Sequence, residues 1–202
     1  MSGFVKDTYM TISSPGTGQY SEKRSRFMAF ADHVESEQEA MAFISNLKSK
    51  YHDARHVCYA YIIGKQGEAY RQNDDGEPSG TGGRPILGQL HSANLTYAVV
   101  AVVRYFGGVK LGPGPLAVAY KTAAALALQD CRIEEKVVMS HFKVSVPYAD
   151  ADLAMRFVRN AGGQVMPHSY TENGPILTVS IREKEDPALR DKLSHILSLK
   201  IL

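Results

Sequence analysis

The sequence has few cysteines, almost no net charge and no long apolar segment, and each absence excludes a class of protein. Two cysteines, Cys58 and Cys131, cannot form a disulfide framework. No run of about 18 apolar residues is present, so no membrane-spanning helix is expected. The first ten residues, MSGFVKDTYM, lack the apolar core of a signal peptide, so we expect a cytoplasmic protein. Lys and Arg number 23 against 21 Asp and Glu, which excludes a histone-like coat for nucleic acid.

What is present is an ordinary globular composition with one uneven feature. The 202 residues are 44% hydrophobic and 22% charged, which is enough for one or two domains with a sizeable core. Nine of the 17 glycines and four of the nine prolines fall between positions 71 and 115. Clustered glycine and proline mark loops with unusual backbone geometry. We therefore expect the functional residues to lie in this window.

The pattern before this window predicts strands at 4–13, 24–34 and 56–63, with a turn-rich connector at 13–20. Ser36 begins a capping box, and the apolar residues that follow recur at helical spacing, which predicts a helix at about 37–50. A short strand at 68–72 completes a hairpin with the strand before it.

Within and after the window, the pattern predicts a short helix that ends near residue 94. The almost wholly apolar segment 97–106 is typical of a central strand buried on both faces, and 116–129 of a buried helix. A charged segment near 132–138 indicates a domain boundary. Beyond it, the order β-α-β-β-α with a short last strand indicates a ferredoxin-like domain, in which Asp150 caps the first helix.

The first glycine loop, 74–85, concentrates polar groups where a helix begins. It holds three carboxylates, two hydroxyls and one guanidinium: Asp74, Asp75, Glu77, Ser79, Thr81 and Arg84. Free backbone N–H groups at a helix start, with hydroxyls and Arg84, are suited to bind phosphate. The alternative is a purely structural loop whose glycines permit positive φ. The spacing matches neither a Walker motif nor a calcium loop, and nothing in it requires a metal.

The second glycine loop, 104–115, joins the buried strand to the buried helix, an arrangement common at anion sites. Arg104 and Lys110 add positive charge, Gly107 and Gly108 bring the backbone close, and Tyr105 and Phe106 offer a face for stacking a base. The alternative is that the aromatic rings complete the core and the cations are simply solvated.

Two smaller features carry candidate chemistry. His56 and Cys58 are two residues apart on a strand and so share a face; they suit a nucleophile pair, or a buried thiol beside a hydrogen-bonded histidine. Lys23, Arg24 and Arg26 form a small basic cluster that opens a strand, and either contacts phosphate or an acidic partner or is a solvated surface.

These residues resemble the YigZ/IMPACT family. The carriers of the resemblance are DDGEPSGTGGRPIL, VVRYFGGVKLG and AYKTAA, with EKRSRF and ARHVCYAY upstream. Two differences concern the second loop: Pro115 lacks an N–H that an anion would use, and Val118 stands where relatives often have arginine. Both weaken a phosphate site there.

The resemblance implies an α+β fold of two domains. Residues 1–135 would form an IMPACT-type β-α-β sandwich similar to the second domain of ribosomal protein S5, and 136–202 a ferredoxin-like domain similar to one in elongation factor G. Our leading interpretation is a translation-associated regulator without enzymatic activity or cofactor, which binds RNA, the ribosome or a translation factor. Its eukaryotic relatives resemble regulators that compete for the activator of a starvation kinase.

The expected binding groove is lined by both glycine loops and the 23–26 strand, with phosphate contacts from Lys23, Arg24, Arg26, Arg84, Arg104 and Lys110, and stacking on Tyr105. Two alternatives remain open. One is a nucleotide-binding enzyme similar to small-molecule kinases, with Asp74, Asp75 or Glu77 as base or metal ligand. The other is a module that binds only proteins.

Overall fold

The computed structural model describes residues 7–202, apart from the side chains of residues 167 and 168. The chain divides into two compact units. One is Tyr9–Lys136, and the other is Val137–Leu202 together with Asp7 and Thr8. The expected boundary after residue 135 lies one residue before this division. None of the helices in the described part is long and apolar enough to cross a membrane.

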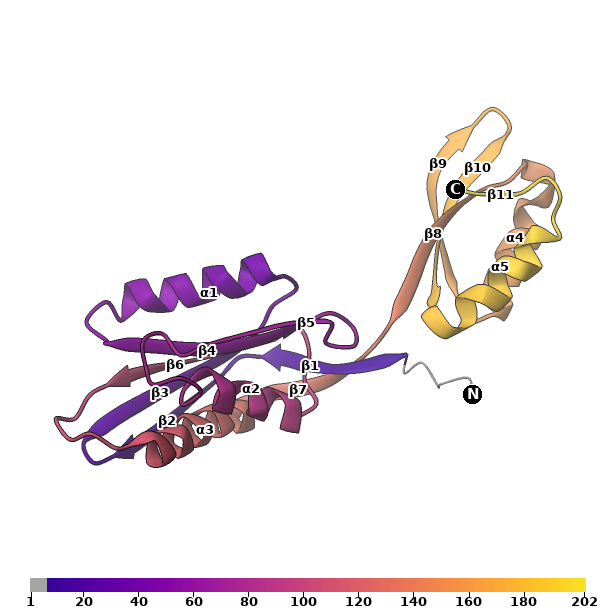
Figure 1. Cartoon of the computed structure of the whole chain (residues 1–202). Helices are drawn as coiled ribbons and strands as arrows, with labels where there is room; N and C mark the ends of the chain where they lie inside the picture. The colour runs from indigo at the N-terminus through magenta and orange to yellow at the C-terminus, as the bar shows by residue number, and fades with distance from the viewer. Residues whose placement is uncertain (1–6) are drawn as a thin grey trace. The chain divides into compact units, whose positions relative to one another are not determined.

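The first unit is built on a five-stranded antiparallel sheet with the order β2-β3-β6-β4-β5 (Figure 1). Its strands are β2 (Gly16–Glu22), β3 (Ser25–His33), β6 (Ala98–Tyr105), β4 (His56–Ile63) and β5 (Ala69–Asn73). Helix α1 (Glu37–Lys50) covers one face of the sheet. Helices α2 (Gly83–Ser92) and α3 (Pro113–Asp130) cover the other face. The sheet is therefore enclosed between two layers of helices.

Strand β6 lies at the centre of this sheet, as its apolar sequence predicts. Val100 and Val102 belong to the core beneath α2 and α3, whereas Val99 and Val103 belong to the core beneath α1. Successive side chains of a strand point to opposite faces, so an all-apolar strand fills two cores at once. Helix α1 begins as expected, because Ser36 accepts a hydrogen bond from the Glu39 N–H.

Strand β2 occupies the segment that the sequence indicated as a turn-rich connector, so that expectation was wrong. Its glycines serve helix packing. A Cβ on Gly18 would lie 2.4 Å from the backbone nitrogen of Ala127, and one on Gly16 would lie 2.3 Å from the Ala127 oxygen. Their absence lets the alanine-rich helix α3 approach the strand backbone closely, and the sheet ladder to β3 supplies the hydrogen bonds.

A second difference concerns the charged segment expected to separate the domains. It forms strand β7 (Arg132–Val137), which pairs with β1 (Thr8–Ser14) in a two-stranded sheet. The expected strand 4–13 overlaps β1, although residues 4–6 lie outside the described part. A strand exposed on both faces tolerates consecutive charges, because only its backbone must be paired.

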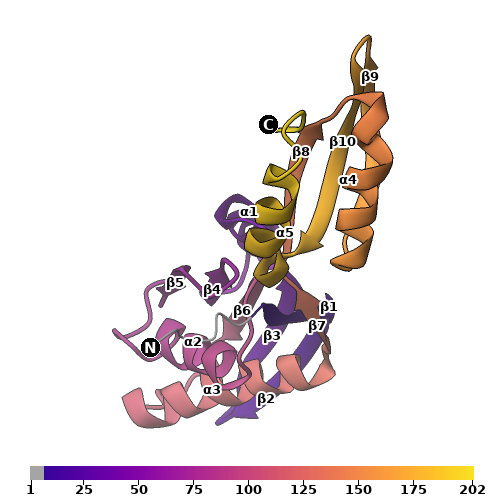
Figure 2. The same ribbon diagram turned by 90° about the vertical axis from the view of Figure 1, so that its right-hand side faces the viewer.

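The second unit has the element order β-α-β-β-α-β. The elements are β8 (Met139–Ser145), α4 (Tyr148–Asn160), β9 (Gln164–Thr171), β10 (Gly174–Arg182), a 3-10 turn (Glu183–Glu185), α5 (Asp186–Ser194) and β11 (Lys200–Ile201). The antiparallel sheet has the order β11-β8-β10-β9. Figure 2 shows α4 and α5 on the same side of it, and their buried residues, such as Ala154 and Leu193, complete the core.

Asp150 does not cap helix α4, so that expectation was wrong. Pro147 occupies the cap position, and Asp150 lies inside the first turn of α4. Its carboxylate accepts a hydrogen bond from the Ser198 hydroxyl at 2.6 Å, and so connects α4 to the segment before β11.

Candidate functional site

The first glycine loop is folded around its own Asp74. The carboxylate accepts hydrogen bonds from the backbone N–H groups of Gly80, Gly82 and Gly83 at 2.8, 2.9 and 2.8 Å. Gly83 is the first residue of α2. The donors that the sequence offered to a phosphate are therefore bonded to a carboxylate of the same loop. Partial burial raises the pKa of Asp74, but these donors outweigh it and hold that pKa below its ordinary value.

Asp75 fastens the same loop to its surroundings. Its carboxylate accepts hydrogen bonds from Lys48 Nζ at 2.5 Å and from the Val57 N–H at 2.7 Å. Its backbone oxygen lies 2.8 Å from Nδ1 of His56. Because a carbonyl only accepts, Nδ1 carries the proton and Nε2 is left for another partner.

Glu77 and Arg104 form a buried ion pair where the two glycine loops meet. Arg104 Nη1 donates to Glu77 Oε1 at 2.5 Å, and the Tyr120 hydroxyl donates to the same oxygen at 2.8 Å. The two charged residues are only 8% and 6% exposed. Burial, first of all, raises the pKa of Tyr120, so its hydroxyl stays protonated and able to donate. The Arg104 guanidinium also lies 5.6 Å from the centre of the Phe106 ring.

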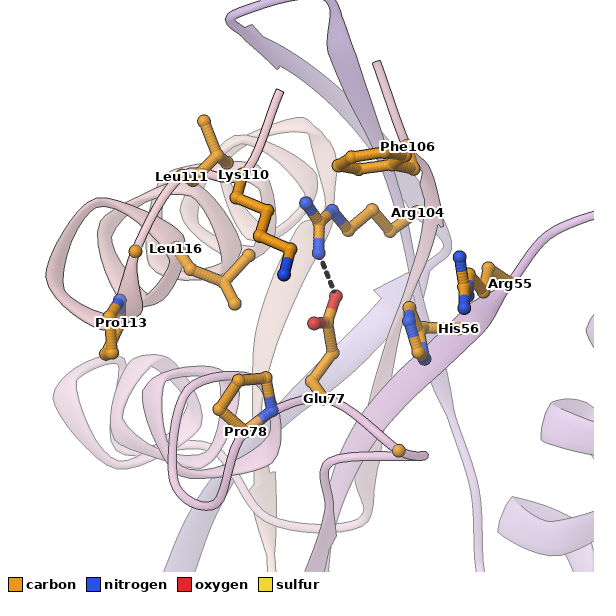
Figure 3. A pocket seen from close by; sticks show the side chains of 12 residues that line it. Arg55, His56, Glu77, Pro78, Arg104, Phe106, Lys110, Leu111, Pro113 and Leu116 are labelled. Carbon is orange, nitrogen blue, oxygen red and sulfur yellow. Dashed lines mark hydrogen bonds and ion pairs between the residues drawn. The ribbon is translucent and has the colours of Figure 1, made fainter. Parts of the chain in front are cut away.

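A pocket of about 500 Å³ opens above this pair (Figure 3). Its walls come from the start of β4, the first loop, the end of β6, the second loop and the first turn of α3. The lining residues are Arg55, His56, Gly76, Glu77, Pro78, Arg104, Phe106, Lys110, Leu111, Gly112, Pro113 and Leu116. Figure 3 shows the Lys110 side chain directed into the pocket and Arg104 between Phe106 and Glu77. The pocket therefore combines apolar walls with cations.

A second, shallower depression of about 480 Å³ lies along α2 and α3. Arg84 and Lys121 line it, with Gly80, Pro85, Gly88, Gln89 and Ser92. Both cations are exposed, as are Arg55 and Lys110 in the pocket.

The predicted groove residues do not all lie on one face of the sheet: some are on the side of α3 and others on the side of α1. Four of the fifteen predicted site residues line the pocket: His56, Glu77, Arg104 and Lys110. Arg104 faces α3, whereas Tyr105 packs against the core beneath α1, because adjacent strand residues point to opposite faces. A single groove therefore cannot use both Arg104 and Tyr105.

The basic cluster is a hairpin turn with one cation on the α1 face. Lys23 and Arg24, which were expected to open a strand, are the two turn residues between β2 and β3, with φ of 44° and 65°. Arg26 lies over the Tyr105 ring at 4.9 Å, and the Tyr105 hydroxyl donates to Asp53. Gly107 packs against the turn, where a Cβ would lie 2.1 Å from the Arg24 carbonyl carbon.

The remaining predicted residues have local roles. The Thr81 side chain is buried and donates to the Pro78 oxygen at 2.6 Å, while Ser79 and Gly108 are exposed. Cys58 is fully buried and its thiol donates to the Asp74 oxygen at 3.0 Å rather than to His56. Burial raises the pKa of that thiol well above its usual range, which opposes a nucleophilic role. No cluster of three or more metal-ligating side chains occurs among the residues that the structure describes.

Sequence reasoning missed Tyr120 and Lys121. Tyr120 is the one aromatic residue in an alanine-rich helix, and a buried tyrosine needs a partner for its hydroxyl. That signal would have indicated a polar group in the core near α3. Lys121 is one of the few charged residues of the same helix, and only the fold shows that it lines the same depression as Arg84.

Residues 23–128 match the Impact N-terminal domain. The chain belongs to the IMPACT family. An IMPACT family member of Bacillus subtilis, YvyE, is 33% identical over 189 residues, which is 94% of this chain and 87% of that protein. A Thermus thermophilus IMPACT family member is 50% identical over 107 residues, 53% of this chain and 56% of that one.

Among solved structures, the crystal structure of a hypothetical protein has a TM-score of 0.70, is 26% identical and covers 98% of both chains. The fold is thus a mixed α/β arrangement that this relative shares throughout its length. The IMPACT match contains both glycine loops and all the residues of both depressions. The candidate site therefore lies within the part of the chain that matches this domain.

Proposed function

We propose that this IMPACT family member is a cytoplasmic, translation-associated regulator without enzymatic activity, and that it binds RNA, free or within the ribosome. The association with translation comes from the family resemblance. The RNA partner is argued from the exposed cations of the α2–α3 face.

RNA binding is supported by a difference between acids and bases around the first glycine loop: the carboxylates are bonded within the chain, whereas the cations are exposed. Asp74 is bonded to three N–H groups, Asp75 to Lys48 and Val57, and Glu77 to Arg104 and Tyr120. The cations of the same region stay at the surface, namely Arg55, Arg84, Lys110 and Lys121. None of the four takes part in an ion pair in the described part of the chain. The near-neutral total charge thus conceals a locally positive face, which favours phosphate contacts.

We also propose finer identities for the two units. The sandwich would correspond to the second domain of ribosomal protein S5, within residues 1–135. The second unit, within 136–202, would be a ferredoxin-like domain. Support for the latter comes from its β-α-β-β-α-β order and its sheet order β11-β8-β10-β9, which place the first and third strands side by side at the centre.

Filter binding of the full chain to transfer RNA and ribosomal RNA at two salt concentrations tests the RNA partner. We expect affinity that falls steeply with salt. Replacing Arg84 and Lys121 together by alanine should lower the slope of log K against log salt by about 1.4–1.8, since each phosphate contact contributes about 0.7 on single strands and about 0.9 on a duplex.

The matched control replaces two exposed lysines elsewhere, Lys50→Ala with Lys192→Ala, on α1 and α5. It should leave the slope unchanged. Binding that does not depend on salt, or an equal loss in both double variants, would refute RNA binding by this face. Arg104→Ala is unsuitable here, because it would remove half of a buried ion pair.

A further inference from the structure

The floor of the pocket above Glu77 and Arg104 contains a charged donor without an acceptor. Arg104 Nε is buried and has no hydrogen-bond partner among the described residues, although Nη1 is bonded to Glu77. Buried charged N–H groups are almost always paired, because an unmade bond costs the full desolvation of the group. Arg104 lines the pocket, so an oxygen atom of a ligand held there would be close to this guanidinium.

The charge of the pocket indicates a doubly negative ligand group. Its lining contains three cations, Arg55, Arg104 and Lys110, and a single carboxylate, Glu77, which is already bonded to Arg104. Arg55 and Lys110 therefore remain uncompensated, and in the view of Figure 3 they lie on opposite sides of the pocket. A phosphate monoester carries about −1.5 to −2 charges at neutral pH, whereas a carboxylate carries one. Two cations facing one cavity match the monoester.

The walls of the pocket indicate a flat apolar body attached to that group. Phe106 is 44% exposed, with the Arg104 guanidinium near its ring. Pro78, Leu111, Pro113 and Leu116 supply further apolar surface. A nucleobase is such a body, since every base has a π-face that stacks on an aromatic ring. The volume of about 500 Å³ falls within the range of small-ligand pockets.

We propose that this pocket binds a nucleotide with a terminal phosphate monoester, whose base stacks on Phe106 and whose phosphate is held by Lys110 and Arg55. The nucleotide is either a free nucleoside monophosphate or the 5′-phosphorylated end of an RNA strand. The second case rests on the proposed function, for it would give RNA binding a preference for phosphorylated ends. Nothing in the pocket requires that the nucleotide react.

Binding of adenosine monophosphate, adenosine, and one short RNA with a 5′-phosphate or a 5′-hydroxyl to the full chain tests the proposal. Calorimetry suits the small ligands and fluorescence anisotropy the RNA. Adenosine monophosphate should bind about tenfold or more tightly than adenosine, because one charge-assisted hydrogen bond changes affinity by that factor. If the RNA end is the source, the phosphorylated strand should exceed the hydroxyl strand by a similar factor.

Two sets of variants distinguish this site from the general cationic face. Lys110→Ala with Arg55→Ala should abolish the preference for phosphate, and Phe106→Ala should weaken the nucleotide but not inorganic phosphate. Arg84→Ala with Lys121→Ala should weaken RNA overall and keep the preference. All substituted side chains are exposed, so the fold should persist.

Equal binding of phosphorylated and unphosphorylated ligands would overturn the pocket proposal. So would a preference that survives Lys110→Ala with Arg55→Ala. If either result is found while RNA binding remains salt-dependent, the pocket proposal fails but the proposed function stands. If the wild-type chain binds no RNA at all, the proposed function fails, and the comparison of adenosine monophosphate with adenosine alone tests the pocket.

Discussion

Arg104 Nη1 lies 2.5 Å from Glu77 Oε1, and both side chains are more than nine-tenths buried between the sheet and α3. Removal of one member of a buried ion pair leaves the other charge buried without a partner, whereas replacement of both by apolar groups leaves no buried charge. The pair therefore makes each residue depend on the other.

We expect Arg104→Met or Glu77→Gln alone to lower the free energy of unfolding by about 3–5 kcal/mol. The double variant should be more stable than the sum of the two losses implies, by about 1–3 kcal/mol. Urea unfolding of the four proteins measures this coupling. Strict additivity would show that the two charges do not stabilise each other.

Asp74 should make stability depend on acid pH. Its pKa in the folded chain lies below the ordinary 3.8, because the three backbone N–H donors outweigh burial. A carboxyl whose pKa is depressed by folding stabilises the fold fully above the unfolded-state pKa, and this contribution is lost as the pH falls through the folded-state pKa. The wild-type chain should therefore lose stability below about pH 4.

Asp74→Asn should remove that part of the pH dependence, since its amide does not titrate. At pH 7 we expect a loss of about 1–3 kcal/mol, because hydrogen bonds to a charged acceptor are replaced by neutral ones. Thermal unfolding between pH 3 and pH 7 compares the two proteins. An exposed acid such as Asp152 provides the control as Asp152→Asn, which should follow the wild-type curve. Parallel curves for wild type and Asp74→Asn would contradict the assignment.

The sequence was sufficient for the elements whose pattern is local. The capping box at Ser36 predicted the start of α1, and the apolar run 97–106 predicted the central strand β6. It was insufficient where tertiary contacts override local preference. Gly16 and Gly18 argued for a turn, yet the approach of α3 makes a strand of this segment.

The same limit applies to the site. The sequence located the two glycine loops, but it could not show that the Asp74 carboxylate occupies the N–H groups at the start of α2. Alternation along the predicted strand 97–106 places Arg104 and Tyr105 on opposite faces, but it could not show which face lies under α3, because that requires one face to be recognisably polar. Both Val103 and Val102 are apolar, so the pattern gave no reference.

The two cysteines should differ in reactivity towards a thiol reagent. Cys58 is fully buried and bonded to the Asp74 oxygen, whereas Cys131 is partly exposed and burial raises its pKa only to about 11. Only the thiolate reacts, and access matters as well. Iodoacetamide at pH 8 should therefore modify Cys131 first, and Cys58 only as the chain opens.

The Cys131→Ser variant isolates Cys58 for this measurement, with mass spectrometry as the readout. Iodoacetamide should label Cys58 slowly in buffer and rapidly in urea. Fast labelling of this variant under native conditions would show an accessible thiolate and would restore the nucleophile interpretation of Cys58 and His56.

Two glycines that differ in surroundings should respond in opposite directions to alanine. A Cβ on Gly18 would lie 2.4 Å from the Ala127 nitrogen and 2.8 Å from the Ala123 oxygen, so α3 would have to move away from β2. Overpacking of this kind costs about 1–3 kcal/mol. Gly88 lies inside α2 with nothing within 4 Å of a Cβ, and alanine there should add about 0.5–1 kcal/mol through helix propensity. Urea midpoints of Gly18→Ala and Gly88→Ala measure the two changes, and a Gly18→Ala protein as stable as wild type would show that β2 and α3 do not need their close contact.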